Sequence, residues 1–459
     1  MSGRIVNDLP SPKGRVSVRL DQSSLRPLRR AARGLDELGA AGLVRAVATQ
    51  VALRWMRSTY ASKAETELRT ALKGYQHPAV IIAGTHDWYY PYWQRAHHLA
   101  KALAAHGRAT VYVSPSHGRD PELAARKIDA HLYMTPHLDA AVKATVKPFL
   151  YVSSTNTRNL LEVVRLAIEH GGHILYDYVD AIDPTISNGP ITPQLQALHR
   201  ELLANEQLAT VVATADCLFS EIERARRSRL ALVTNGVDVA HFSLPKSPKQ
   251  PIGRLAELAG RDRPIVGYFG LLANWLDYGI VYQSARLRPQ YDFVLIGPDF
   301  DGSIPQRSEL PENVHILPPV TYTDLPAHAA LFDVTMIPFA INGITDATSP
   351  IKLFEYMALG KPIVSTPIPE SRKYDCVVIA SEPRGFAQAV DRALALGRDG
   401  AYRAKLDALA AQNSWHGKAA EVLSLITLPA GSAGTAQGML RQPAAMDVMS
   451  AASTGVPAQ

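Results

Sequence analysis

The sequence is 459 residues long, with 47% hydrophobic and 20% charged residues. This composition is typical of globular proteins and excludes a collagen-like or largely disordered chain. The only two cysteines, Cys217 and Cys376, have neither zinc-site spacing nor the number that a disulfide scaffold needs. No apolar run reaches about 18 residues, so we expect no membrane-spanning helix.

The net charge of +6 is concentrated at the N-terminus. Residues 1–75 contain 14 Lys/Arg and 6 Asp/Glu, whereas the remainder contains 34 and 36. A nucleic-acid-binding body would carry its own basic face, so we expect no nucleic-acid partner. Residues 23–73 combine a helical apolar pattern with many arginines. They fit either peripheral contact with an anionic membrane or a helix that packs its apolar face on the body.

From residue 76 to 237, short apolar runs alternate with longer amphipathic stretches. This alternation predicts a parallel α/β sheet. The expected strands are Ala79–Ala83, Thr110–Val113, Phe149–Val152, Ile174–Val179, Thr210–Ala213 and Ala231–Thr234. Helices are expected near 91–106, 156–170, 193–209 and 217–227.

The proline-rich, charged stretch 238–263 predicts a linker. A second α/β unit is expected over 264–427, and a disordered tail over 428–459. The expected strands of the 264–427 unit are Pro264–Phe269, Tyr291–Ile296, Val314–Leu317, Val334–Pro338, Pro362–Ser365 and Val377–Ala380. Its helices are expected at 276–287, 323–332, Pro350–Leu359, 383–397, 400–411 and 414–427.

The most informative segment is the helix expected over Pro350–Leu359. Ser349 suits the N-cap, Pro350 the first helical position, and Gly360 the position after the last turn. The helix begins in a loop at the carboxyl end of a strand, where open α/β sheets bind ligands. Its free N–H groups and positive dipole end favour an anion such as a diphosphate.

Lys352 and Glu355 share one face of this helix because they are three residues apart. Lys352 in the first turn is placed to contact a phosphate, and Glu355 to accept hydrogen bonds from hydroxyls such as a ribose diol. The alternative is an ion pair on the surface of a capped helix. An anion site beside a diol acceptor indicates a nucleoside diphosphate.

Three other strand-end loops carry candidate residues. Gly270 follows the first strand of the second unit and lets the backbone approach a ligand closely. In the first unit, Asp177, Asp180 and Asp183 recur after a strand; one is a candidate base or hydroxyl acceptor, and capping or turn roles are the alternative. The loop after the first strand offers four more candidates, Gly84, His86, Asp87 and Arg95. Its aromatic neighbours suit sugar rings or ordinary packing.

No metal-ligand motif is present, so we expect no metal and no bound cofactor. The loop after the strand Pro264–Phe269 lacks a GxGxxG motif, and no P-loop motif occurs anywhere in the sequence.

Three segments together resemble the GT-B glycosyltransferases, most closely the retaining family 4, also called glycosyl transferases group 1. They are Val233-Thr-Asn-Gly-Val-Asp238 with Phe242, then Ile265–Gly270 with Phe293–Pro298, and Pro350–Val364. The resemblance covers about residues 78–427. It implies two Rossmann-like domains facing a cleft, the first binding the acceptor and the second a nucleoside-diphosphate sugar.

The resemblance also implies roles for single residues. Glu355 would hold the ribose hydroxyls, and Gly270 and Asn274 would lie beneath the diphosphate. The diphosphate would be held by Lys352 and by backbone around Thr348, Ser349, Pro350 and Ile351. The Gly84–Asp87 loop would approach the transferred sugar, and the last helices would return to the first domain.

The sequence departs from the family pattern at two places. The family has two glutamates with seven residues between them; Glu355 fits the second, but the first is Ala347, with Asp346 beside it. The family also commonly has Arg and Lys after the glycine loop, and Leu271–Gly279 contains neither.

We therefore expect a hexosyl transfer, with retention, to a polysaccharide, oligosaccharide or lipid-linked acceptor in cell-envelope or exopolysaccharide synthesis. The expected location is the cytoplasm, with contact to the inner face of the cell membrane through residues 23–73. Two alternatives stay open: a nucleotide-sugar epimerase of GT-B fold, and a non-catalytic binding partner.

Overall fold

The computed structural model describes residues 59–115, 124–187, 189–242, 253–306 and 310–426. Residues 59–71 are helical, at the end of the stretch expected to be helical. The membrane interpretation of residues 23–73 rests mainly on residues before 59, which lie outside the described residues. The tail 428–459 also lies outside them. Among the described helices, none has both the length and the apolar character needed to cross a bilayer.

The first sheet has eight strands in the order β3-β4-β2-β1-β5-β6-β7-β8. All neighbours pair in parallel except β3 and β4. The strands are β1 Val80–Ala83, β2 Thr110–Val113, β3 Arg126–Asp129, β4 Leu132–Thr135, β5 Phe149–Ser153, β6 His173–Tyr178, β7 Ala209–Ala213 and β8 Leu230–Leu232. The short pair β3 and β4 was not predicted. β3 is a polar edge strand with three of its four residues exposed, so it lacks the apolar signal of a buried strand.

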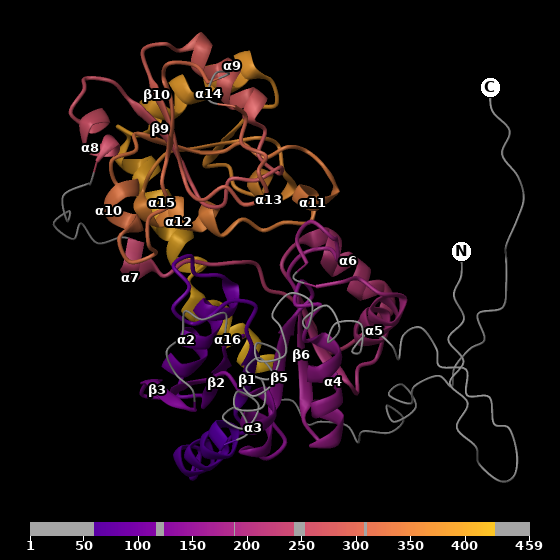
Figure 1. Ribbon diagram of the computed structural model, residues 1–459. Helices are drawn as coiled ribbons and strands as arrows, with labels where there is room; N and C mark the ends of the chain where they lie inside the picture. Colours follow the sequence, from indigo (N-terminus) through magenta and orange to yellow (C-terminus); the bar gives the residue numbers. More distant parts are fainter. Residues whose placement is uncertain (1–58, 116–123, 188, 243–252, 307–309, 427–459) are drawn as a thin grey trace, which may run out of the picture. The chain divides into compact units, whose positions relative to one another are not determined.

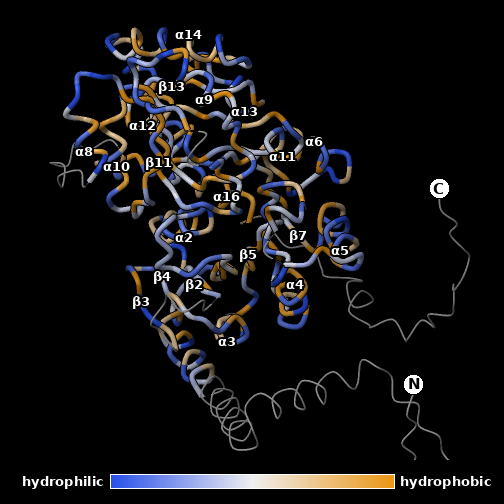
Figure 2. The backbone as a smooth tube through the Cα atoms, turned by 45° about the horizontal axis from the view of Figure 1, so that its top comes forward, coloured by the Kyte–Doolittle hydropathy of each residue, from blue (hydrophilic) through white to orange (hydrophobic). Residues whose placement is uncertain are grey.

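Helices connect these strands and cover the sheet (Figure 1). They are α2 Arg95–Ala105, α3 Leu138–Lys143, α4 Leu160–Glu169, α5 Pro193–Ala204 and α6 Asp216–Ala225. Figure 2 shows hydrophobic and hydrophilic residues alternating around α4 and α5, as in helices that turn one face to a sheet.

The second sheet has six parallel strands in the order β11-β10-β9-β12-β13-β14. They are β9 Ile265–Phe269, β10 Asp292–Ile296, β11 Val314–Leu317, β12 Val334–Ile337, β13 Ile363–Ser365 and β14 Val377–Ile379. Its helices are α9 Tyr278–Leu287, α10 Leu325–Ala329, α11 Gly343–Asp346, α12 Ile351–Leu359, α13 Pro369–Arg372, α14 Pro383–Leu396 and α15 Gly400–Gln412. The two parallel α/β sheets predicted from the sequence are therefore confirmed.

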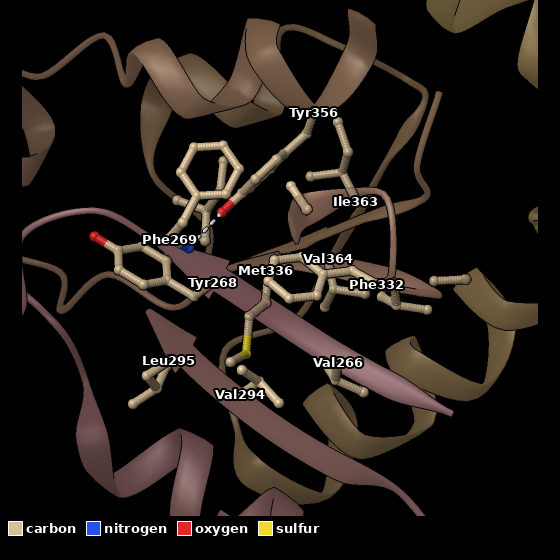
Figure 3. Packing of buried hydrophobic residues seen from close by; sticks show 14 of the residues in the cluster. Val266, Tyr268, Phe269, Val294, Leu295, Phe332, Met336, Tyr356, Ile363 and Val364 are labelled. Atoms are coloured by element: carbon tan, nitrogen blue, oxygen red, sulfur yellow. Dashed lines mark hydrogen bonds between the residues drawn. The ribbon is translucent and has the colours of Figure 1, made fainter. Parts of the chain in front are cut away.

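The core of the second sheet fixes α12 against β9. The Tyr356 hydroxyl of α12 lies 3.3 Å from the backbone nitrogen of Phe269, from which it accepts a hydrogen bond (Figure 3). In the middle of β9, a Cβ on Gly267 would lie 2.2 Å from the ring of Phe332, so only glycine leaves room for that ring. The Tyr356 contact holds α12 beside the end of β9.

The stretch 238–263 is not a plain linker. It contains two short helices, α7 Val239–Phe242 and α8 Arg254–Ala259. Leu255 and Leu258 of α8 and Phe242 of α7 are buried in the core of the second sheet. The prolines in this stretch favoured the prediction of a linker, although some of its apolar residues are buried in the core. Residues 243–252 are not among those described.

The last of the described helices, α16 Trp415–Ile426, packs against α2 (Figure 1). Trp415, Ala419, Val422 and Ile426 belong to the same apolar cluster as residues of β1 and α2. The Trp415 ring stacks on His98 with centroids 4.9 Å apart. Helix α16 thus completes the core of the first domain.

Candidate active site

A cavity of about 490 Å³ lies between the two sheets. Its walls are the loops that follow parallel strands of both. Thr85 follows β1, Thr155 follows β5 and Asp180 follows β6, while Gly270 and Gly297 follow β9 and β10. The carboxyl ends of the strands in both sheets therefore converge on one space, the usual ligand site of open α/β sheets.

The start of α12 forms one wall of the cavity. Pro350, not Ser349, is the N-cap, with φ −67° and ψ 122°, and no side chain caps the helix. Ser349 cannot cap because Asn235 engages it: the Asn235 backbone N–H donates to Ser349 Oγ at 3.3 Å, and Asn235 Nδ2 donates to the Ser349 carbonyl at 2.5 Å. The Leu353 N–H donates to the Pro350 carbonyl at 3.1 Å, and no side chain caps the N–H groups of Ile351 and Lys352, which are placed for an anionic ligand.

The other end of α12 agrees with the sequence. Gly360 ends the helix in the left-handed conformation, with φ 63°. A Cβ at this position would also lie 2.0 Å from the Arg403 guanidinium carbon.

Lys352 lies in the first turn of α12 and lines the cavity. Its Nζ is 5.3 Å from the centroid of the Tyr268 ring, a cation–π contact. Burial lowers the pKa of Lys352, and the nearby Glu355 carboxylate opposes this change. The ammonium group is therefore only partly compensated by the protein and would be stabilised by an anionic ligand.

Glu355 lies one turn deeper and also lines the cavity. Its side chain is almost fully buried, and this burial raises its pKa to about 7, against the effect of Lys352. The alternative of a surface ion pair is wrong, because both side chains lie in the cavity wall and Glu355 is only 6% exposed. The ribose contact of Glu355 stays a prediction.

Asp180 faces the start of α12 from the first domain. Its Oδ1 accepts a hydrogen bond of 3.1 Å from the Thr348 hydroxyl, and its backbone carbonyl accepts one of 2.8 Å from Ser154. Burial raises the pKa of Asp180 to about 7, although the Thr348 hydroxyl lowers it in part. A carboxyl with this pKa is suited to exchange a proton near neutral pH.

Arg95 lines the cavity, but its guanidinium is engaged within the protein. Nε donates to Asp177 at 2.7 Å, Nη1 to the carbonyl of Thr234 and the side chain of Asn235, and Nη2 to the carbonyl of Val233. The Tyr151 hydroxyl donates to the same carboxylate at 2.5 Å. Arg95 is therefore positioned to hold the 233–235 loop, which in turn holds Ser349, and not to bind an anion.

Four residues expected at the site lie outside the cavity lining. A Cβ on Gly84 would lie 2.5 Å from the Tyr112 hydroxyl oxygen, so this glycine makes room for a ring. Asp87 is buried and accepts a hydrogen bond from Ser114. Asn274 and Asp346 are exposed; the Asn274 N–H donates to Asp301, and the Asp346 carbonyl accepts from the Cys217 thiol.

The remaining expected residues line the cavity: His86, Gly270, Thr348, Ser349, Pro350 and Ile351. The ring nitrogen Nδ1 of His86 lies 2.9 Å from the Thr85 hydroxyl oxygen. Ala347, where the family has its first glutamate, is buried against apolar residues of the first domain. Apolar contact between the domains thus takes the place of a carboxylate.

Tyr322, in the loop after β11, also lines the cavity and was not predicted as a site residue. Its ring stacks on Trp93 at 5.3 Å and on His241 at 4.3 Å, and its backbone N–H donates to the Pro91 carbonyl. The rule that ligands lie at strand ends would have indicated this loop. Among the described residues, no three His, Cys, Asp or Glu side chains gather as they would around a metal ion.

Comparison with known proteins agrees with this geometry. Residues 263–395 match the model of the family described as glycosyl transferases group 1. A teichuronic acid biosynthesis glycosyltransferase of Bacillus subtilis, TuaH, is 28% identical over 229 residues, which are 47% of this chain and 56% of that protein. The match thus spans little more than half the length of this relative.

Several solved structures share the fold. HepE of Anabaena in complex with UDP is 14% identical, with a TM-score of 0.57, over 76% of this chain and 100% of that one. A UDP-forming trehalose-phosphate synthase from Burkholderia xenovorans is 13% identical, with a TM-score of 0.54, over 78% and 100% of the two chains. The two sheets, their shared cavity and these structural neighbours define a GT-B fold. The match to the glycosyl transferases group 1 model falls on its second domain.

Proposed function

We propose that this protein is a glycosyltransferase that moves a hexose from a nucleoside diphosphate to an acceptor hydroxyl. One observation carries the proposal: the uncapped start of α12, Lys352 and Glu355 line a single cavity at the strand ends. Donors for a diphosphate and an acceptor for ribose hydroxyls are thereby brought together. The match to a glycosyltransferase family supports the same activity.

A UDP-sugar is the donor that we propose. Structures of HepE hold UDP, in one case with glucose, and that protein shares the fold of this chain. Ile296, Val320 and Leu325 add an apolar surface to the cavity on the side of the second domain, suited to a nucleobase.

In the proposed reaction, the bond between the sugar and the diphosphate breaks and a bond to the acceptor oxygen forms. The leaving diphosphate accepts the acceptor's proton, so a front-face transfer with retention needs no separate base. Lys352 and the first-turn N–H groups of α12 stabilise the charge that develops on the leaving group. Asp180 and His86 approach from the first domain as candidate acid–base or hydroxyl-binding groups. The anomeric configuration of the product, measured by NMR, tests retention.

We further propose a role in cell-envelope or exopolysaccharide synthesis, supported by the name of the Bacillus subtilis relative. The acceptor would be a polysaccharide, oligosaccharide or lipid-linked glycan. Residues 23–73 would contact the inner face of the membrane, a proposal that rests on their charge and apolar pattern. Equal binding of the full chain and a chain lacking residues 1–75 to anionic vesicles would contradict the membrane proposal.

The activity is tested first by donor binding, using calorimetry with UDP, GDP, ADP and dTDP. We expect UDP to bind. We expect Lys352→Ala and Glu355→Gln each to lower turnover about ten-fold or more, which raises the activation free energy by at least about 1.4 kcal/mol. Lys405→Ala is the matched control, because Lys405 pairs with Asp375 on the surface. Unchanged turnover in both site variants would refute this site, and epimerised donor without acceptor would favour the epimerase.

A further inference from the structure

Hydroxyl side chains line the part of the cavity that belongs to the first domain. Ser153 is the last residue of β5 and Thr155 follows it, and Thr185 and Ser187 lie in the loop after β6. The Ser153 and Thr155 hydroxyl oxygens are 3.4 Å apart, and Thr185 donates to Asp183 at 2.6 Å. These four residues are called the hydroxyl wall below.

Within the hydroxyl wall, Ser187 is the residue whose hydroxyl has no hydrogen-bond partner among the described residues. Its Oγ is also shielded from solvent. A shielded hydroxyl without a partner loses free energy relative to one in water. A ligand in the cavity that donates to or accepts from Ser187 would recover that loss.

The charges around the cavity differ between its two halves. Among the described residues that line the cavity, Arg95 is the only arginine and Lys352 the only lysine. Arg95 is engaged by Asp177 and by the 233–235 loop, and Lys352 belongs to the wall formed by α12. Beside the hydroxyl wall stands Asp180, a carboxyl, and its hydrogen bond from Thr348 comes from a neutral hydroxyl.

We infer that the hydroxyl wall binds an uncharged sugar of the acceptor, and not a sugar phosphate or a uronate. This inference rests on the proposed function and specifies its acceptor. Serine and threonine hydroxyls both donate and accept, as sugar hydroxyls do, so the two sets pair in either direction. A phosphate or carboxylate here would lie near Asp180, with no free Arg or Lys among the described residues that line this part of the cavity, and burying an unpaired charge is costly.

Saturation-transfer NMR on the full chain with saturating UDP tests the inference. The probes are methyl glycosides of glucose, galactose, mannose and N-acetylglucosamine, each beside its 6-phosphate, with methyl glucuronide added. We expect at least one neutral glycoside to bind, and its 6-phosphate to bind at least ten-fold more weakly. Equal or tighter binding of the phosphate or of the glucuronide would overturn the inference, as would failure of every neutral glycoside while UDP is bound.

Variants of the hydroxyl wall locate the binding. Ser187→Ala and Thr155→Val should each weaken the glycoside several-fold and leave UDP affinity unchanged, whereas Ser187→Arg should shift the preference toward the 6-phosphate. Ser220→Ala, an exposed serine on α6, is the control. If the wild type binds UDP but these variants bind the glycoside normally, the inference is wrong and the proposed function stands. If the wild type fails to bind any nucleotide, the proposed function itself fails, and the inference with it.

Discussion

The side chain of Lys352 runs directly over Gly270, where a Cβ would lie 2.1 Å from Lys352 Cε and 2.6 Å from Nζ. Gly270 also has φ 139°, a conformation that side-chain-bearing residues rarely adopt. The glycine loop after β9 and the cation of α12 thus share one small volume. Gly270 positions Lys352, although it contributes no side chain of its own.

Replacing Gly270 with alanine should therefore weaken UDP binding as well as stability. The added methyl displaces Lys352, and the backbone strain costs on the order of 1–3 kcal/mol. Calorimetric titration with UDP and urea unfolding measure the two effects. Gly107→Ala is the control, because Gly107 has φ 76° but open space around its Cβ position. It should lose stability only; equal UDP affinity in both variants would contradict the role of Gly270.

Asp180 should make the protein less stable as the pH rises through mildly acidic values. Its pKa is about 7 in the folded protein, whereas an unfolded Asp titrates near pH 4. Between these values the folded state holds a proton that the unfolded chain releases, so the free energy of unfolding falls with rising pH. Asp180→Asn should flatten this decline between pH 4.5 and 7.5 in urea unfolding. Asp407→Asn, on the exposed face of α15, should keep the wild-type slope, and a wild-type slope in Asp180→Asn would refute the assignment.

Breaking the ion pair of Arg95 with Asp177 should be strongly destabilising. Arg95→Met leaves a fully buried carboxylate without its cation, which costs about 3–5 kcal/mol. UDP affinity should also fall, because Arg95 holds the loop that engages Ser349. Arg254→Met removes an exposed ion pair and should cost about 0–1 kcal/mol. Similar losses of stability in the two variants would contradict this account.

Restoring the first glutamate of the family pattern should not raise turnover in the proposed reaction. Ala347 is 4% exposed and packs among apolar residues of the first domain, so Ala347→Glu places a carboxylate where it has no room or partner. We expect a lower melting temperature and no gain in turnover, whereas Ala347→Ser should change both only slightly. A rise in turnover with Ala347→Glu would show that the carboxylate reaches the cavity.

Except for β4, the buried parallel strands were predictable from sequence because they are mainly apolar runs; β2 and β11 have the predicted bounds. Lys352 and Glu355 were predictable because helical spacing places both on one face. Local patterns did not indicate β3, nor the four-residue helices α11 and α13. They also misplaced Gly84 and Ser349, because Tyr112 and Asn235, which decide the role of each, are distant in the sequence.

The order in which the chain is made gives α16 a further consequence. The core beside β1 and α2 contains Trp415, Ala419, Val422 and Ile426, which leave the ribosome more than 300 residues after Val80. During synthesis, the apolar surface of the first domain that α16 covers stays exposed until the second domain has been translated. The first domain is therefore completed only after the second domain has been translated, and a nascent chain stopped before Trp415 would expose the α2 surface that α16 normally covers.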